Sequence, residues 1–156
     1  MMNVFFPDEE VTKDDLYFMC YMIERVARTL HRRNCEVVNA IGYEELCRKI
    51  SLASVLHCEN PLKVVADWID EYDLQDGDFN ILDVDRELVE RVPTETQMGK
   101  VYKRLILNTM QSNEDYVQGM IRVYNSNICK TIDNYNCSAY YEPSPVIARA
   151  YMMGTF

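Results

Sequence analysis

Apolar residues recur every three or four positions over most of the chain, and this spacing predicts a mainly α fold. The clearest example lies between Leu16 and Leu30, with apolar residues at Leu16, Met19, Cys20, Ile23, Val26, Ala27 and Leu30. Thr12, followed three residues later by Asp15, resembles a capping box, in which each side chain accepts a hydrogen bond from the backbone of the other residue. We therefore expect a long amphipathic helix to begin directly after Thr12.

Start and stop signals predict three more helices in the first half of the chain. Asn34 is expected to cap a short helix that ends at Gly42 in a left-handed conformation, and a third helix is expected over residues 43–55. Asn60 followed by Pro61 is typical of a helix start, because proline lacks the N–H that the first turn leaves unpaired. The apolar face expected for this fourth helix comprises Leu62, Val65, Ala66 and Ile69.

The last third of the chain carries similar signals. Thr94 with Gln97, and Ser112 with Asp115, each resemble a capping box followed by apolar residues at helical spacing. A final helix is expected to begin at Ser144-Pro145 and to close at Gly154. Together these elements predict a compact helical domain, or two helical lobes that share one core.

One segment departs from the helical pattern and carries the charge. The whole chain has a formal charge of −9, and residues 67–90 alone contain ten acidic residues and one arginine, so the rest sums to about zero. The acidic residues are Asp67, Asp70, Glu71, Asp73, Asp76, Asp78, Asp83, Asp85, Glu87 and Glu90. Turn residues surround Gly77, and residues 79–84 fit an extended piece or a short strand. We expect an acidic irregular connector over 73–93, between helical lobes at 1–72 and 94–156.

Candidate catalytic and metal sites are weak. His57 and Cys58 are adjacent, and neighbours on a regular helix point about 100° apart, so this pair is not expected to form a hydrogen-bonded nucleophile and base. A zinc site could recruit His31, Cys35 and Cys47 with one of those two residues, but the chain has no closely spaced cysteine pair. We predict no catalytic residue, no cofactor and no metal.

The environment expected for the chain follows from its apolar runs. No run approaches the roughly 18 apolar residues of a membrane-spanning helix, and the first residues lack the basic head and apolar stretch of a signal peptide. We expect a cytoplasmic protein without membrane contact, with six reduced cysteines that act mainly as small apolar residues. A homodimer is compatible with the sequence.

A DNA-binding regulator is one alternative. Residues 26–41 have the outline of a helix-turn-helix, and arginines lie close by at Arg25, Arg28, Arg32 and Arg33. The second helix would have to read the major groove, but it contains Glu36 and neither lysine nor arginine. The acidic segment also repels phosphate backbones, so the sequence disfavours nucleic acid as a partner.

Three stretches carry a family resemblance. Residues 21–28 (YMIERVAR), 55–60 (VLHCEN) and 66–72 (ADWIDEY) resemble a family of small helical proteins from anaerobic gut bacteria. Members of that family tend to be encoded beside ADP-ribosyltransferase-like or other toxin–antitoxin components. The resemblance implies a role in a toxin–antitoxin or anti-phage module, in which an acidic helical protein lies against a partner protein. It transfers no active-site residue.

The function expected from these observations is that of a non-catalytic protein-binding component with a basic protein partner, since opposite charges speed encounter and select partners. The predicted partner-binding residues are Asp70, Glu71, Asp73, Asp76, Asp78, Asp83 and Asp85. A toxin enzyme acting on nucleic acid or nucleotide is the catalytic alternative, and it needs a basic or phosphate-binding cleft. A third alternative is that the acidic segment is only a solvated connector.

Overall fold

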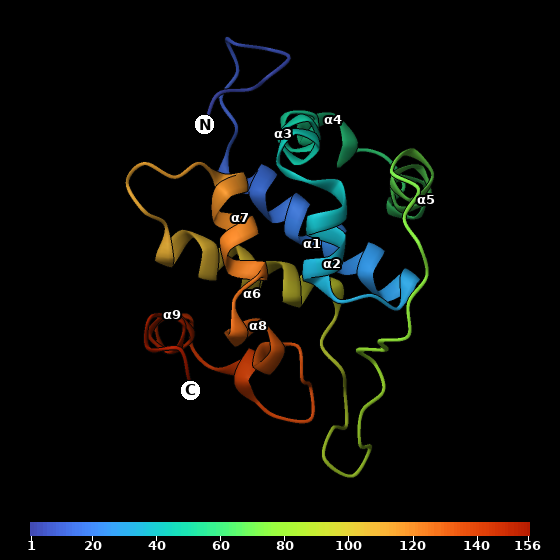
Figure 1. Ribbon diagram of the computed structural model, residues 1–156, viewed down its shortest axis with the longest axis vertical. Helices are drawn as coiled ribbons and strands as arrows, with labels where there is room; N and C mark the ends of the chain where they lie inside the picture. The colour runs from blue at the N-terminus through green and yellow to red at the C-terminus, as the bar shows by residue number, and fades with distance from the viewer.

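Helices build the whole fold, and no β-strand is present, which confirms the mainly α class (Figure 1). The computed structural model describes residues 1–156. The elements are α1 (Lys13–Leu30), α2 (Asn34–Ile41), α3 (Tyr43–Ser51), α4 (Ala53–Leu56), α5 (Pro61–Glu71), α6 (Glu95–Thr109), α7 (Tyr116–Tyr124), α8 (Asn127–Ile132), the 3₁₀ turn η1 (Ala139–Tyr141) and α9 (Ser144–Met153). None of the helices combines the length and apolar character needed to cross a lipid bilayer.

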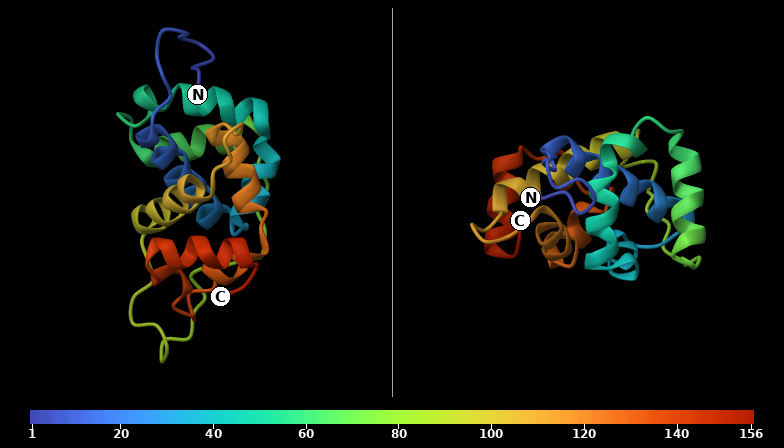
Figure 2. Two further views of the ribbon diagram at one scale, coloured as in Figure 1. Left: turned by 90° about the vertical axis from the view of Figure 1, so that its left-hand side faces the viewer. Right: turned by 90° about the horizontal axis from the view of Figure 1, so that it is seen from above.

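Helix α1 lies at the centre of the molecule. It packs most extensively against α6, and α2, α3, α4 and α5 cover its other sides (Figures 1 and 2). Because partners surround it, α1 buries most of its length, and Leu16, Met22 and Val26 have no exposed surface. Apolar residues of 1–72 and 94–156 belong to a single hydrophobic cluster.

Local signals located the helix starts well where a side chain caps its own helix. Thr12 and Asp15 form both bonds of the capping box at α1, and Thr94 with Gln97 does the same at α6. Asn60 accepts a hydrogen bond from the Leu62 N–H at the start of α5. At α7 the prediction was wrong, because the cap is not Ser112. The capping box is formed one turn later, by Asp115 and Gln118.

Tertiary contacts changed two other predictions. Asn34 does not cap α2. It is the first residue of that helix, and its buried side chain is used in a bond to α1. In α5 the buried face contains Val64, Val65 and Trp68, whereas Leu62 is 65% exposed. The buried face is therefore rotated relative to the predicted one, and it includes Trp68, which is 1% exposed.

Gly42 ends α2 as predicted, but its backbone is not in the left-handed helical region. Its φ of 84° and ψ of 166° combine a positive φ with an extended ψ, a region that is essentially restricted to glycine. This conformation lets α3 begin at the next residue, Tyr43. The helix predicted over 43–55 is interrupted at Leu52, so that α3 and α4 are separate elements.

Candidate functional site

The acidic connector leaves α5, extends beyond the helices at its tip and returns to α6 without regular structure (Figure 1). Residues 79–84 form no strand. The first half of the connector is tied to the end of α1. The Gly77 N–H donates to the Leu30 carbonyl at 2.8 Å, and the Phe79 N–H donates to the His31 carbonyl at 2.9 Å. A Cβ atom at Gly77 would lie 2.6 Å from that His31 carbonyl oxygen, so the close approach requires glycine here.

Two arginines reinforce this attachment without using the acidic side chains of the connector. The Arg32 guanidinium donates to the carbonyls of Gln75 and Asp76 at 2.9 and 2.8 Å. Arg33 lies over the Phe79 ring, with 4.0 Å between the guanidinium carbon and the ring centroid. Arg32 and Arg33 therefore contact backbone carbonyls and an aromatic ring of the connector, and neither arginine forms an ion pair with a connector carboxylate.

The seven predicted partner-binding residues are all exposed, namely Asp70, Glu71, Asp73, Asp76, Asp78, Asp83 and Asp85. Among the ten acidic residues of 67–90, only two form ion pairs, Glu71 with Lys49 at 2.5 Å and Asp67 with Lys63 at 2.8 Å. The other eight have no cationic partner. They are spread along the chain from α5 through the connector, and no group of acidic, histidine or cysteine side chains could hold a metal ion.

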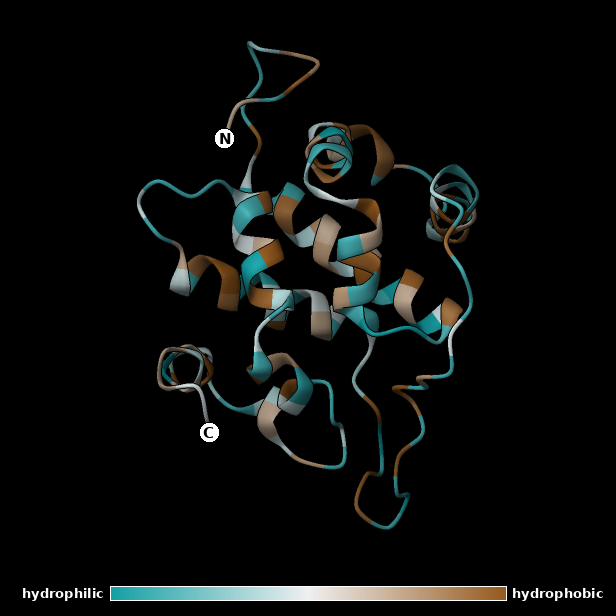
Figure 3. Ribbon diagram, in the orientation of Figure 1, coloured by the Kyte–Doolittle hydropathy of each residue, from teal (hydrophilic) through white to brown (hydrophobic).

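Apolar residues divide the connector into anchored and exposed parts. Leu74, Ile81 and Val89 are buried, and Leu74 and Ile81 belong to the hydrophobic core, which anchors the first half of the connector to the body. Leu82 is 37% exposed and Leu88 is 68% exposed, and each is adjacent in the sequence to an unpaired carboxylate, Asp83 or Glu87. Figure 3 shows these apolar stretches within the otherwise hydrophilic connector.

The four arginines of the helix-turn-helix outline are engaged within the chain. Arg25 donates to the Tyr21 hydroxyl at 3.0 Å, Arg28 pairs with a buried glutamate, and Arg32 and Arg33 hold the connector. Helix α2 itself packs against α1 and α7 and buries its apolar face. No observation therefore favours α2 as a DNA-reading helix.

A buried polar network that the sequence analysis missed joins α1 to the C-terminal half. Glu24, only 1% exposed, accepts hydrogen bonds from Arg28 at 3.1 Å, from the Tyr135 hydroxyl at 2.9 Å and from the Asn34 amide at 2.9 Å. One signal was available, because Glu24 follows Cys20 by four positions and therefore lies within the apolar stripe of α1.

Asp133 is the second buried carboxylate of this network. It accepts a 2.6 Å hydrogen bond from the Tyr102 hydroxyl and a long bond of 3.4 Å from the Asn34 amide. Burial and the nearby Glu24 carboxylate raise the pKa of Asp133 well above its usual range. Each carboxylate has partners within the chain, which is typical of a structural network rather than a reacting pair.

The raised pKa of Asp133 predicts a pH dependence of stability. The folded state holds the Asp133 proton to a higher pH than the unfolded chain does. The free energy of unfolding is therefore highest below the ordinary pKa of an aspartate, and it falls as the pH rises towards the pKa of Asp133 in the folded state. The substitution Asp133→Asn keeps an acceptor for the Tyr102 hydroxyl and introduces a side chain that cannot ionise. We expect the variant to be more stable than the parent at pH 7 and to lose less stability between pH 5 and pH 8.

Urea unfolding followed by circular dichroism at several pH values would measure this effect. Asp70→Asn is the matched control, because Asp70 is exposed and has no ion pair. If Asp133→Asn and Asp70→Asn gave parallel pH profiles, ionisation of Asp133 would not be linked to folding.

His57 and Cys58 correct another expectation. The His57 Nε2 lies 3.7 Å from the Cys58 Sγ, and its Nδ1 lies 3.1 Å from the Ala53 carbonyl. The pair can make contact because both residues lie in the turn after α4 rather than within a regular helix. Both are exposed and line none of the larger cavities. Cys20 and Cys129 are buried instead, and burial raises the pKa of each thiol to about 12.

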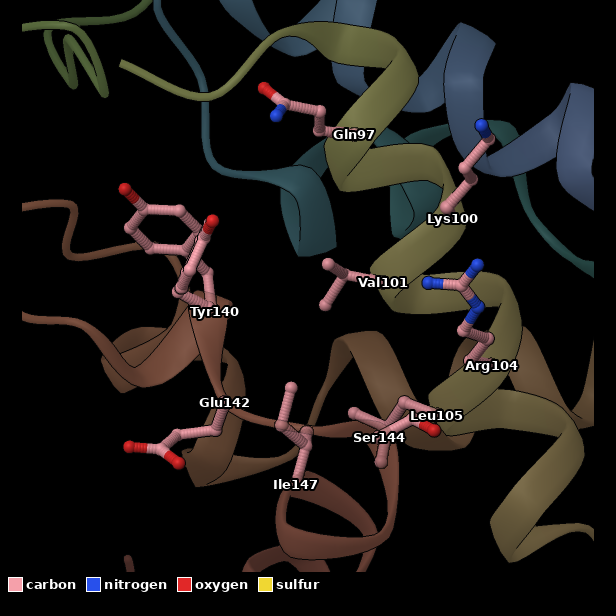
Figure 4. A pocket seen from close by; sticks show the side chains of 10 residues that line it. Gln97, Lys100, Val101, Arg104, Leu105, Tyr140, Glu142, Ser144 and Ile147 are labelled. Carbon is pink, nitrogen blue, oxygen red and sulfur yellow. The ribbon is translucent and has the colours of Figure 1, made fainter. Parts of the chain in front are cut away.

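A cavity of about 240 Å³ lies between α6 and α9, with η1 at one end (Figure 4). Val101, Leu105 and Ile147 provide its apolar surface, and Tyr140 stands to one side. Its polar residues are Gln97, Lys100, Arg104, Tyr141, Glu142 and Ser144. This cavity was not predictable from the sequence, because three segments that are separate in the chain build it.

No protein-family model, curated protein or solved structure matches the chain. The family resemblance of residues 21–28, 55–60 and 66–72 therefore stays a prediction. Charged groups without an ion pair occur on the acidic connector and, as Lys100 and Arg104, in the lining of the cavity between α6 and α9.

Proposed function

We propose that the protein is a non-catalytic protein-binding component that uses its acidic connector to contact a basic partner. The observation that carries this proposal is that eight exposed carboxylates without cationic partners lie along a segment whose backbone is attached to the body by other groups. The contacting surface comprises the end of α5 and the connector, with Asp70, Glu71, Asp73, Asp76, Asp78, Asp83 and Asp85 as its principal charged groups. All of these except Glu71, which pairs with Lys49, belong to the eight unpaired carboxylates.

Attachment of the connector matters for binding because a fixed segment loses little conformational entropy when a partner docks. Gly77 and Arg32 hold its first half against α1, and Leu74 and Ile81 anchor it through apolar contacts. A purely solvated spacer would not need these contacts. The free carboxylates add a negative field that attracts a cationic surface before contact and orients it.

The partner surface should also contain an apolar part. Leu82 and Leu88 are exposed beside the unpaired carboxylates, and apolar side chains at the centre of an interface provide much of the binding energy, while charges at the rim provide selectivity. In a toxin–antitoxin or anti-phage module, a protein with a cationic cleft for nucleic acid would present both features. The acidic connector would then occupy a surface that otherwise attracts phosphates.

A charge-neutralised variant tests this proposal. It replaces five connector residues with asparagine, namely Asp73, Asp76, Asp78, Asp83 and Asp85. We expect the fold to survive, because exposed charges contribute little to stability. Association with the partner should slow by about 10-fold or more at low salt, and its salt dependence should flatten, since steering of this kind is screened over about 8 Å at physiological ionic strength.

The partner would be captured by a photo-crosslinking residue at position 88 in cells that make the protein, and association would then be followed by stopped flow with the purified pair. A matched control introduces neutral amides at five exposed acids elsewhere that form no ion pair, namely Asp8, Glu9, Glu10, Glu44 and Glu142. Equal association rates for the two variants would show that the connector has no special part in binding. Crosslinked proteins without a basic surface would contradict the proposal as well.

A further inference from the structure

The cavity between α6 and α9 lies at the end of the molecule opposite α5 in the view from above (Figure 2). Its Tyr140 also borders a hollow that is lined by Glu90 of the connector. Two cations lie on the α6 side of the cavity. Lys100 and Arg104, one turn apart, form no ion pair, so their charges are available to a ligand. In Figure 4 the Arg104 guanidinium faces the cavity, whereas the Lys100 ammonium group points away from its centre.

Further hydrogen-bond donors surround the same space. The hydroxyl groups of Tyr140, Tyr141 and Ser144 form no hydrogen bond within the chain, although each lines the cavity. Ser144 is the first residue of α9, so the positive end of that helix also faces this region. Glu142 is the only carboxylate in the lining, and Figure 4 shows it directed away from the cavity centre. The polar groups that face the cavity are therefore mainly hydrogen-bond donors that have no acceptor within the chain.

The apolar part of the cavity selects against a simple inorganic anion. Leu105 and Ile147 are nearly fully buried beneath it, and Val101 lies beside the Arg104 guanidinium in Figure 4. The Tyr140 ring stands at the side, packed edge to face on Tyr135 with 5.3 Å between the ring centroids. Such a surface loses water favourably when a hydrocarbon or aromatic group covers it.

We propose that this cavity binds a small organic carboxylate with an apolar body. The carboxylate contacts Arg104, because a guanidinium presents paired donors that match its two oxygens. The body lies against Val101 and Ile147, beside the ring of Tyr140. A volume of about 240 Å³ suits a single ring with a short chain. The nearby Glu142 and the net charge of −9 favour a monoanion over a multiply charged ligand.

The probe for this site is 3-phenylpropanoate, titrated into the full chain and followed by ¹H–¹⁵N NMR. The neutral 3-phenylpropanamide and the 2-phenylethylammonium cation have similar apolar bodies and serve as ligand controls. We expect chemical-shift changes in α6, η1 and α9 with the carboxylate, and affinity at least about 10-fold weaker for both controls, because a charge-assisted hydrogen bond is lost.

The decisive variant is Arg104→Gln. It should weaken the binding of 3-phenylpropanoate by about 10-fold or more and leave the affinity for 3-phenylpropanamide unchanged. Arg149→Gln is its matched control, since Arg149 is an exposed arginine of α9 outside the cavity lining. Circular dichroism would verify that both variants fold. The proposal is overturned by absent binding at millimolar probe, by equal affinity for carboxylate and amide, by shifts centred elsewhere, or by unchanged binding in Arg104→Gln. The connector variant should bind the probe normally, so this test is independent of the proposed function.

Discussion

Replacing Arg28 with methionine should destabilise the protein by about 3–5 kcal/mol, because the change leaves a buried carboxylate without its cation. Glu24 has 1% of its surface exposed and cannot recover solvation by a small movement. Arg28 also donates to the Pro93 carbonyl at 2.8 Å and lies 3.1 Å from the Tyr135 hydroxyl, so its loss removes a link between α1 and the start of α6.

Urea unfolding monitored by circular dichroism measures this effect. Arg25→Met is the control on the same helix, and it should cost about 1 kcal/mol or less because Arg25 bonds only the partly buried Tyr21 hydroxyl. Adding Glu24→Gln to Arg28→Met removes the uncompensated charge and should recover part of the loss. An Arg28→Met variant as stable as Arg25→Met would mean that water or a rearranged side chain neutralises Glu24.

Replacing Trp68 with alanine should also cost about 3–5 kcal/mol, because the largest fully buried side chain of the fold leaves a cavity between α5 and α1. Leu62→Ala on the same helix should change stability by less than about 0.5 kcal/mol, since Leu62 is 65% exposed. Differential scanning calorimetry of the two variants checks the contrast.

Helix α5 packs mainly against α1 and carries the first acids of the proposed binding edge, so the Trp68→Ala variant has a second readout. Amide hydrogen exchange should accelerate in α5 and the connector more than in α6. Uniform acceleration throughout the chain would indicate that α5 does not open separately from the core.

Sequence reasoning succeeded where the physical cause is local. The caps formed by Thr12 and Thr94 depend on residues three positions away, and the spacing of apolar residues reports directly which face of α1 or α6 is buried. The exposed acidic connector was predictable in the same way, because many adjacent carboxylates cannot be buried together.

The remaining features depend on contacts between distant parts of the chain. Asn34 was predicted to be a helix cap, but its side-chain amide donates hydrogen bonds to Glu24 and Asp133 instead. Asp133 lies 99 positions away in the sequence. Arg32 reaches connector carbonyls 43 and 44 residues downstream. The cavity beside Arg104 combines three elements. No local pattern in the sequence predicts these contacts, because each of them forms only when the helices pack together.

The central position of α1 has a consequence for the order in which the chain is made. The ribosome completes α1 first, but α6, its most extensive partner, begins only at Glu95. At roughly 5–20 residues per second, synthesis of the intervening segment takes about 3–13 s. During that interval the part of the apolar face of α1 that packs on α6 has no permanent cover, and it is a natural binding site for ribosome-associated chaperones. Loss of such chaperones should therefore lower the yield of folded protein. The effect should be larger than that of slower translation after α6 has been made.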